Sequence, residues 1–316
     1  MDALLTGLRA AAEPTRFRLL VLCAHGEFTA SELTEIVGQS QPRVSRHLRL
    51  LCEAGLVDRQ REGARVFFRL ALAGPGAELA RRLVALGPAQ SGALARDLAR
   101  LDAVKQRRRA AAEAYFRANV HRWSEIRALH VPEAAVEAAI VRRVTPGGAD
   151  HLLDVGTGTG RMLELLAPHV RRGTGIDVSR DMLAVARANL DRDGCRHCRV
   201  RQADMYDLPL AADSVDLVTV HQVLHYADEP DRAVAEVARV LRPDGQVVIV
   251  DFSRHELEQL RARHAHRRLG FADAEIEAWC RAGGLVPVAP EKLAGGRLTV
   301  AVWAARKPVE PERSPP

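Results

Sequence analysis

The sequence lacks long apolar runs and contains few cysteines and few aromatic residues. None of its apolar stretches reaches the roughly 18 residues that a membrane-spanning helix needs. An aspartate at position 2, with no basic segment ahead of an apolar one, argues against a secretory signal peptide. The five cysteines are scattered and odd in number, which argues against a disulfide framework. These absences predict a cytoplasmic protein.

Positive charge is in excess, and it is concentrated near the start of the chain. The 316 residues carry a formal net charge of +6, and the 47% hydrophobic and 27% charged residues are typical of a globular protein. Between positions 40 and 70, seven arginines accompany three acidic residues, a local excess of four positive charges. A genome rich in G and C explains the general abundance of arginine and alanine. The local cluster favours a polyanionic partner such as nucleic acid.

The cysteines offer little to a metal ion. Cys195 and Cys198 form a CxxC pair in a short loop, but no second pair follows at zinc-finger distance. Structural zinc sites need four ligands, so we predict no metal site. Release of DNA by zinc bound at this pair is kept as a minor alternative.

Helix signals follow one another closely in the first 60 residues. Pro14 is placed to open a helix, and Thr29 with Glu32 fits a capping box in front of SELTEIVG. Ser40 is placed to cap the next helix, whose first turn tolerates Pro42 because no N–H is needed there. A short helix, a tight turn and a second helix predict a helix-turn-helix.

The second of these helices has two different faces. Val44, Leu48 and Leu51 repeat at helical spacing and are expected to face a core. The opposite side is basic and polar, which suits the major groove of DNA, although a solvated charged face is the common alternative. The predicted DNA contacts on this helix and on the hairpin after it are Ser40, Gln41, Arg43, Ser45, Arg46, Arg49, Arg61 and Arg65.

The segment VDRQREGARVFFRL (57–70) predicts a basic hairpin that turns at Glu62 and Gly63. Its arginines are expected to contact phosphates or the minor groove. Residues 3–72 as a whole resemble the winged helix-turn-helix of ArsR/SmtB-type transcriptional regulators, and SQPRVSRHLRLLCEAGLV is close to that family's recognition-helix pattern. The resemblance implies a homodimer that binds a near-palindromic operator in double-stranded DNA.

The resemblance also implies where the dimer pairs and how it senses a signal. One contact would come from the first helix, through Leu4, Leu5 and Leu8, and the other from the helix after the wing. Candidates for the second contact are Leu79, Leu83, Leu94, Leu98 and Leu101. Metal-sensing members carry ligands before the turn or on the dimer helix, but SELTEIVG and residues 76–105 contain neither cysteine nor histidine. The signal is therefore expected from elsewhere in the chain.

Residues 88–128 are rich in alanine, arginine and leucine, and they predict one or two long helices. The basic run at Lys105, Arg107, Arg108 and Arg109 could touch the DNA backbone, but it is more typical of a solvated helix face.

From about residue 150, apolar strands alternate with helices, which predicts a doubly wound, Rossmann-like α/β sheet. RPDG (242–245) is expected to form a turn between a helix and a strand. The expected strands are HLLDV (151–155), GTGIDV (173–178), CRVRQAD (198–204), DLVTV (216–220), QVVIVDF (246–252) and LTVAVWAARK (298–307).

The turn after the first of these strands indicates the class of ligand. Gly156, Gly158 and Gly160 form GxGxG, whereas a dinucleotide-binding turn needs glycine at the position of Arg161. No Lys-Ser/Thr pair follows, so the turn is not a P-loop. Such a turn lets a ligand approach the backbone at a helix N-terminus, and Asp177 is placed to accept hydrogen bonds from ribose hydroxyls.

Residues 150–307 resemble the class I S-adenosylmethionine (SAM)-dependent methyltransferases. The resemblance implies that the glycine turn passes the methionine and ribose portions and that Asp177 holds the ribose. Val178 and Met182 would pack the adenine, and Asp204 would read its amino group. The implied cofactor-binding residues are Asp154, Gly156, Gly158, Gly160, Asp177, Val178, Met182, Ala203, Asp204, Met205, His221 and Gln222.

The sequence assigns no catalytic residue. By the resemblance, His221 and Gln222 border the sulfur, but VHQVLHYADEP (220–230) contains no cysteine for arsenite methylation, and no NPPY-like motif indicates methylation of nucleic-acid bases. Methyl transfer depends chiefly on positioning, so a missing general base does not exclude activity.

The whole chain resembles ArsR-type regulators that end in a methyltransferase-like domain, some of which are thought to sense S-adenosylhomocysteine (SAH). We expect a winged helix-turn-helix domain over 1–75, dimerisation and connecting helices over 76–149, a methyltransferase-like domain over 150–307 and a disordered tail over 308–316. The leading hypothesis is a transcriptional regulator with SAH or SAM as its effector. The alternative is an active SAM-dependent small-molecule methyltransferase with an autoregulatory winged helix.

Overall fold

The structure is a computed structural model. It describes residues 2–62, 65–71, 74–87, 92–127, 132–144, 148–191, 194–258, 260, 267–295 and 297–309. The chain divides into two compact units, the first formed by Met1–Ala112 with Arg187–Arg196 and the second by Glu113–Ala186 with His197–Pro316. No helix among the described residues is both long enough and apolar enough to cross a lipid bilayer.

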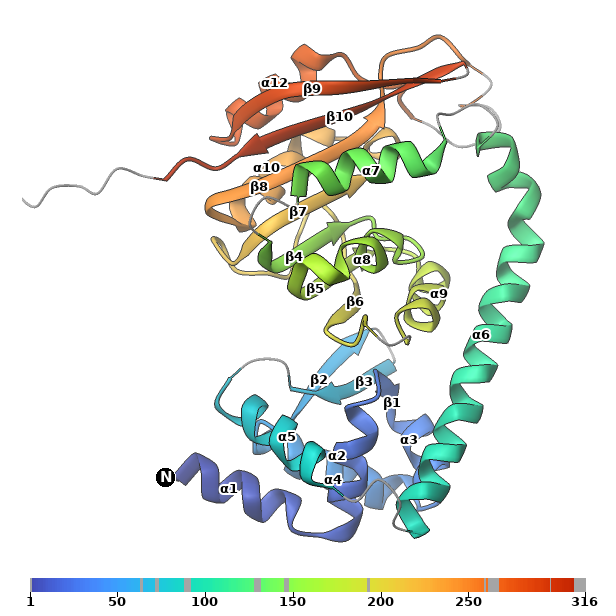
Figure 1. Cartoon of the computed structure of the whole chain (residues 1–316), viewed down its shortest axis with the longest axis vertical. Coiled ribbons are helices and arrows are strands. Elements are labelled where there is room, and N and C mark those ends of the chain that lie inside the picture. Colours follow the sequence, from blue (N-terminus) through green and yellow to red (C-terminus); the bar gives the residue numbers. More distant parts are fainter. Residues whose placement is uncertain are drawn as a thin grey trace, which may run out of the picture. The chain divides into compact units, whose positions relative to one another are not determined.

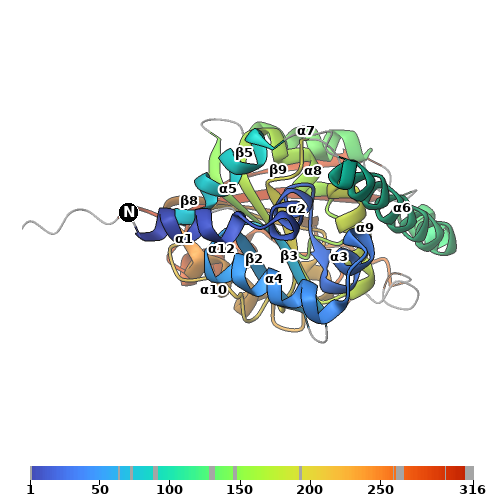
Figure 2. The same ribbon diagram turned by 90° about the horizontal axis from the view of Figure 1, so that it is seen from below.

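The first unit is a helix-turn-helix followed by a two-stranded wing (Figure 1). Its helices are α1 (Asp2–Ala11), α2 (Pro14–Cys23), α3 (Ala30–Val37), α4 (Gln41–Glu53), α5 (Pro75–Leu86) and the first part of α6 (Gly92–Arg127). Its strands are β1 (Phe28–Thr29), β2 (Val57–Glu62) and β3 (Arg65–Leu70). They form an antiparallel sheet in the order β1-β3-β2. Figure 2 views this unit from the side on which α1 and α4 lie.

Local hydrogen bonds explain where the first helices begin and end. The predicted capping box is confirmed: Thr29 Oγ1 accepts the Glu32 N–H at 3.2 Å, and Glu32 Oε2 accepts the Thr29 N–H at 2.7 Å. Gly38 ends α3 with a φ of 66°, a left-handed conformation that favours glycine. Ser40 is the N-cap residue of α4 as predicted, but the predicted capping bond is wrong because its side chain makes none. Gly63, in the predicted turn of the wing, lies outside the described residues.

The apolar stripe of α4 packs into the core of the first unit. Val44, Leu48 and Leu51 are fully buried, which confirms the prediction. The stretch predicted to form one or two long helices is a single helix, α6, over its described residues. Burial of Val44, Leu48 and Leu51 turns the basic and polar side of α4 outward.

The second unit is built on a seven-stranded sheet in the order β6-β5-β4-β7-β8-β10-β9. The first five strands in this order are parallel to one another, and β10 pairs antiparallel with both β8 and β9. The strands are β4 (Ala149–Val155), β5 (Val170–Asp177), β6 (Cys198–Gln202), β7 (Val215–His221), β8 (Leu241–Phe252), β9 (Val286–Gly295) and β10 (Leu298–Arg306). The predicted Rossmann-like sheet is thereby confirmed.

Helices cover both faces of this sheet, with α7 and α8 on one face and α10 and α12 on the other (Figures 1 and 2). Their bounds are α7 (Glu133–Val144), α8 (Arg161–Leu166), α9 (Arg180–Leu190), α10 (Pro230–Val240) and α12 (Asp273–Ala282), with short 3₁₀ turns at Ala167–His169 and Leu224–Tyr226. Parallel strands end at the same edge, so the segments after β4, β5, β6, β7 and β8 converge there.

Two sequence predictions differ from the second unit. The predicted turn at 242–245 lies within the bounds of β8, which begins at Leu241, but these four residues pair with neither β7 nor β10. Asp244 has a φ of 64°, and the pairing between β7 and β8 shifts register between Val215 and Leu217, so the irregular backbone is accommodated within the strand. Strand β9 was not predicted, since none of its side chains is buried and it contains two prolines.

Candidate functional site

The glycine turn after β4 holds three glycines in left-handed conformations. Gly156, Gly158 and Gly160 have φ values of 69°, 51° and 83°, which favour glycine at each position. A Cβ on Gly156 would lie 2.4 Å from Val223 Cγ2, so the segment after β7 packs directly on this glycine. At Gly158 the nearest atom to such a Cβ is the Gly156 carbonyl oxygen at 4.0 Å. The turn is therefore packed at Gly156 and open at Gly158.

The residue after Gly160 departs from the dinucleotide-binding pattern. Arg161 begins α8, and its guanidinium pairs with the Glu137 carboxylate of α7 at 2.6 and 2.7 Å. The side chain is about half exposed and has its own partner in the same unit. Arg161 therefore forms a structural ion pair at the position where a dinucleotide-binding turn has glycine.

Asp177, at the end of β5, binds two backbone groups with one carboxylate. Its Oδ2 accepts the Gly158 N–H at 2.9 Å, and its Oδ1 accepts the Ser179 N–H at 2.8 Å. The first bond reaches the glycine turn, and the second reaches the residue before α9. One half-buried carboxylate thus connects the turn to the start of this helix.

The residues predicted around an adenine ring surround Asp177. Val178, the residue after β5, is 61% exposed, and its carbonyl accepts a hydrogen bond from Gln202 Nε2 at 3.0 Å. The Met182 N–H donates to Ser179 Oγ at 3.3 Å, and the Ala203 N–H donates to the Asp177 carbonyl at 3.1 Å. The structure therefore brings the carboxyl ends of β5 and β6 together as the sequence predicted.

The third-strand residues lie at the same edge. Asp204 is exposed, and its Oδ1 accepts the Tyr206 N–H at 3.0 Å. Met205 is half-buried beside it. A carboxylate held by its own loop is preorganised to receive a further donor.

Asp154 lies in a different environment from Asp177. It is 1% exposed, and its Oδ1 accepts the Thr219 hydroxyl of β7 at 2.7 Å. Burial raises the pKa of Asp154 to about 6. This side chain lies inside the sheet, where it bonds β4 to β7, and its contact with a ligand stays a prediction.

On the other side of the glycine turn, β7 ends at two predicted site residues. Burial lowers the pKa of His221 to about 4, so this imidazole is uncharged at neutral pH. Gln222 has a φ of 52°, which is strained for a residue with a side chain, and its N–H donates to the Val250 carbonyl at 2.7 Å. Strained backbone at a strand end is a common feature of functional sites.

A buried histidine and aspartate lie just beyond. His225 Nδ1 is 2.8 Å from Asp251 Oδ1, and the His225 N–H donates to Asp251 Oδ2 at 3.2 Å. Both residues are at most 2% exposed. Asp251 was missed by the sequence analysis, although an acidic residue at the end of an apolar strand was the available signal.

The described residues contain no group of three or more histidine, cysteine, aspartate or glutamate side chains that could hold a metal ion. Cys198 is buried in β6 and Cys195 is half-buried.

The predicted DNA-binding residues form the outer surface of α4 and of the wing. Arg43, Ser45, Arg46 and Arg49 are exposed along α4, and Arg49 has Glu53 one turn away at 3.7 Å. The other four, all exposed as well, are Ser40, Gln41, Arg61 and Arg65. In the wing Arg61 pairs with Val66, and Glu62 pairs with Arg65, so both arginines lie close to the turn. These five exposed arginines give the first unit a surface suited to phosphates.

The leucines predicted to pair two copies behave in two ways. Leu4, Leu5 and Leu8 of α1 are 47%, 40% and 39% exposed, which leaves an apolar face available. Leu94 and Leu101 are each 2% exposed, so the prediction that they supply an intermolecular contact is wrong. The rest of that set, Leu79, Leu83 and Leu98, is partly buried against the core of the first unit.

Comparison with known protein families agrees with both halves of this geometry. Residues 13–59 match the family "Bacterial regulatory protein, arsR family", and residues 153–249 match the family "Methyltransferase domain". One segment of the chain is therefore similar to the ArsR family, and a second segment is similar to methyltransferase domains. The first match covers the helix-turn-helix, and the second runs from β4 into β8, across the glycine turn and Asp177.

Relatives of the methyltransferase domain include YcgJ of Bacillus subtilis, an uncharacterized methyltransferase that is 35% identical over 104 residues, or 33% of this chain and 41% of that protein. The phosphatidylethanolamine N-methyltransferase of Cereibacter sphaeroides is 40% identical over 101 residues, or 32% of this chain and 49% of that protein. The chain thus spans less than half the length of either relative.

Solved structures share the fold of this domain. The YcgJ structure covers 56% of this chain and 100% of its own, with a TM-score of 0.50 and 20% identity. Phosphoethanolamine N-methyltransferase 2 of Haemonchus contortus, solved in complex with S-adenosyl-L-methionine, covers 55% and 53%, with a TM-score of 0.50 and 17% identity.

Proposed function

We propose that this protein is a DNA-binding transcriptional regulator of the ArsR type whose methyltransferase-like domain binds SAH or SAM as an effector. Such a regulator acts on operator DNA, and we therefore propose a cytoplasmic location. The ArsR-family match and the exposed basic surface of the first unit support DNA binding. The methyltransferase match supports a SAM-type ligand.

The observation that carries the ligand proposal is the setting of Asp177. Its carboxylate faces the open glycine turn at Gly158, and the exposed Val178 is its neighbour in sequence. A nucleoside presents paired ribose hydroxyls beside an apolar ring, and a carboxylate next to an exposed valine matches both features. Met182 and Met205 would complete the apolar surface, and Asp204 would accept the adenine amino group.

The sulfur end of the ligand would lie between the glycine turn and β7. His221 is uncharged at neutral pH, so it would not repel the positive sulfonium of SAM. Neither ligand is disfavoured by charge at this position. Both are therefore tested in parallel.

For DNA, we propose a homodimer that pairs through the apolar face of α1. Leu4, Leu5 and Leu8 supply that face, and burying it would bring two copies of α4 into one assembly. Recognition helices related by a twofold axis read half-sites about one helical turn, or roughly 34 Å, apart. Double-stranded operator DNA with a near-palindromic sequence is the proposed target.

The alternative is an active SAM-dependent methyltransferase that acts on a small molecule, with the winged helix controlling its own synthesis. The buried pair of His225 and Asp251 favours it, because a histidine oriented by a carboxylate is a common proton acceptor. SAM, when bound, supplies the methyl group. Incubation of the pure protein with labelled SAM and cell extract tests this alternative, and label in a small molecule would support it.

Calorimetry with SAH and with SAM tests the effector proposal directly. We expect binding by the wild-type protein and roughly 10- to 100-fold weaker binding by Asp177→Asn, since hydrogen bonds to a charged acceptor are lost. Asp181→Asn is the matched control, because Asp181 is an exposed acid in the first turn of α9. Operator affinity is then measured by fluorescence anisotropy with and without each ligand. Binding of neither compound would refute the effector proposal.

A further inference from the structure

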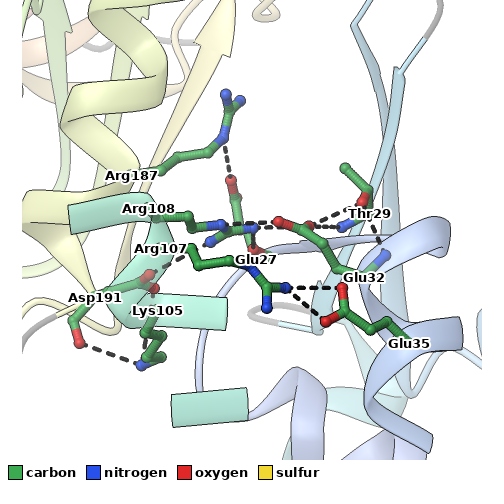
Figure 3. A network of polar contacts seen from close by, with 9 residues as sticks. All are labelled: Glu27, Thr29, Glu32, Glu35, Lys105, Arg107, Arg108, Arg187 and Asp191. Carbon is green, nitrogen blue, oxygen red and sulfur yellow. Dashed lines mark hydrogen bonds and ion pairs between the residues drawn. The ribbon is translucent and has the colours of Figure 1, made fainter. Parts of the chain in front are cut away.

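A short segment from the second half of the sequence belongs to the first unit. Arg187–Arg196, which includes the last residues of α9 and the chain after it, groups with Met1–Ala112. Figure 3 shows charged side chains of this segment among those of α3, of α6 and of Glu27, the residue before β1. Arg187 and Asp191 of the segment pair with Glu27, Lys105 and Arg108. Two further residues extend the network, because Arg69 pairs with Glu27 and Glu32 pairs with Arg108.

Arg187 contacts the wing at Phe67 and also pairs with Glu27, the residue before β1. Its guanidinium carbon lies 3.9 Å from the centre of the Phe67 ring of β3, and its Nε donates to Glu27 Oε2 at 3.4 Å. The side chain is 8% exposed, so both contacts are shielded from water. Cation–π and ion-pair attractions are stronger in such a desolvated environment than in water. The last turn of α9 therefore packs on the strand that forms one side of the wing.

Glu27 joins this contact to a second point on the same strand. Arg69, two residues after Phe67, donates to Glu27 Oε1 at 3.1 Å and to the Arg196 carbonyl at 3.0 Å. One buried carboxylate is thus shared by Arg69 of β3 and Arg187 of α9. The segment fixes β3 at Phe67 and at Arg69, close to the exposed Arg65 of the wing.

Asp191 connects the segment to two helices of the same unit. Its Oδ2 accepts from Arg108 at 3.3 Å, and its backbone carbonyl accepts from Lys105 Nζ at 3.2 Å. Arg108 also pairs at 2.9 Å with Glu32, the capping-box residue of α3. Burial raises the pKa of Asp191 even though Arg108 and Lys105 lie beside it. The helix before the recognition helix is therefore bonded to the same network.

The opposite end of α9 begins at the candidate ligand site. Ser179, the residue before α9, donates its N–H to Asp177 Oδ1, and its hydroxyl accepts the Met182 N–H of the first turn. Ribose hydroxyls that bind Asp177 would share carboxylate oxygens now used by Gly158 and Ser179. A helix of 11 residues is about 16 Å long and stiff enough to move as one body.

From these contacts we propose that α9 is the coupling element between the nucleoside site and the wing. A ligand at Asp177 changes the hold on the first turn of α9, and the last turn changes the position of β3 through Arg187 and Asp191. This inference rests on the proposed function and names its route of regulation. Coupling of this kind is reciprocal, so operator DNA must change the affinity for SAH by the same factor.

The main test uses the full-length protein and the variant Arg187→Gln, which removes the charge and the stacking guanidinium. Arg107→Gln is the matched control, since Arg107 pairs with Glu35 on the surface at 2.6 Å and lies next to Arg108 (Figure 3). Binding of SAH is measured by calorimetry, and amide hydrogen exchange of residues 65–70 is measured with and without saturating SAH. Operator affinity is measured under the same two conditions.

We expect SAH to change exchange in residues 65–70 of the wild-type and control proteins, with operator affinity changing by about tenfold or more. In Arg187→Gln, the dissociation constant for SAH should stay within about threefold of the wild-type value, while the exchange response in residues 65–70 is lost. The change in operator affinity caused by SAH should fall to roughly threefold or less. Arg187→Lys keeps the charge but loses the planar stack, and it should restore part of the response.

The outcomes separate the two proposals. If SAH binds and changes operator affinity, but Arg187→Gln responds as the wild type does, the role of α9 is wrong and the effector function stands. If SAH binds and leaves exchange in residues 65–70 unchanged in the wild type, the route through the wing is wrong. Failure of SAH and SAM to bind refutes the effector function and the coupling together. Should Arg187→Gln fail to fold, Arg187→Lys with the same readouts decides.

Discussion

Two groups of arginines in the first unit have opposite surroundings. The arginines on α4 are exposed to water. Arg49 lies 3.7 Å from Glu53, and the two side chains are 69% and 63% exposed. Arg69 lies 3.1 Å from Glu27, and these two side chains are only 9% and 10% exposed. Exposed pairs contribute little to stability and leave the guanidinium available to phosphate, whereas buried pairs fix the fold because a lone buried charge is costly. Residue type is the same in both groups, and burial decides the role.

Breaking the buried group should have the largest effect. Arg69→Met leaves the Glu27 carboxylate with one fewer partner in a dry environment, and we expect the free energy of unfolding of the first unit to fall by about 3 kcal/mol. Urea denaturation followed by far-UV circular dichroism measures the change. An equal loss on Arg49→Met would show that burial does not distinguish the two groups.

The second unit sharpens the comparison with a buried carboxylate whose hydrogen-bond partner is a hydroxyl. Burial raises the pKa of Asp154 from 3.8 to about 6, so the folded state binds a proton more tightly than the unfolded state. The contribution of Asp154 to stability is therefore full below pH 3.8 and is lost as the pH rises through 6. At 1.36 kcal/mol per pKa unit, the loss is about 3 kcal/mol.

Asp154→Asn should remove this dependence while keeping a bond to Thr219. The measurement is the midpoint of thermal unfolding between pH 4 and pH 8 for wild type and variant. Parallel curves for the two proteins would show that Asp154 titrates normally. Asp213→Asn, at an exposed acid of the same unit, is the control for a general charge effect.

The exposed group is tested by binding. Arg46→Ala should weaken operator affinity by about 2 kcal/mol, or roughly 30-fold, if the side chain reaches a base edge. A contact with phosphate alone would instead lower the salt dependence of binding by about one unit of slope. Fluorescence anisotropy at several salt concentrations separates these cases, and an unchanged affinity would remove Arg46 from the DNA-binding surface.

The smallest expected effect is on stability at the same surface. Arg49→Ala removes the exposed ion pair between Arg49 and Glu53, which lie one helical turn apart. We expect the free energy of unfolding to change by less than about 0.5 kcal/mol. The urea midpoint is the readout. A loss comparable to that of Arg69→Met would mean that Arg49 is held in a network and is not free for DNA.

The sequence predicted local features well because they depend on neighbours. The capping box of Thr29 and Glu32, the apolar stripe of α4 and the glycine turn after β4 all follow from residue types within a few positions. The order of strands and helices after residue 150 predicted a Rossmann-like sheet for the same reason. Asp177 was found because it ends a recognisable strand.

The misses involve residues whose partners are far away in sequence. Lys105 and Arg108 were read as part of a solvated helix face, but Lys105 is 9% exposed and both side chains pair with Asp191. Leu94 and Leu101 were read as intermolecular contacts, and they are buried within the first unit. Periodicity shows that a helix has an apolar or a charged face, but not what covers it.

The sequence by itself therefore determined the two kinds of domain, the polarity of α4 and the ligand class suggested by the glycine turn and Asp177. Only the tertiary structure decided that Arg187 meets Glu27, 160 positions away, and that His225 meets Asp251. The physical reason is that capping hydrogen bonds and helical periodicity depend on residues only a few positions apart. Burial of a charge depends instead on which distant segments pack around it.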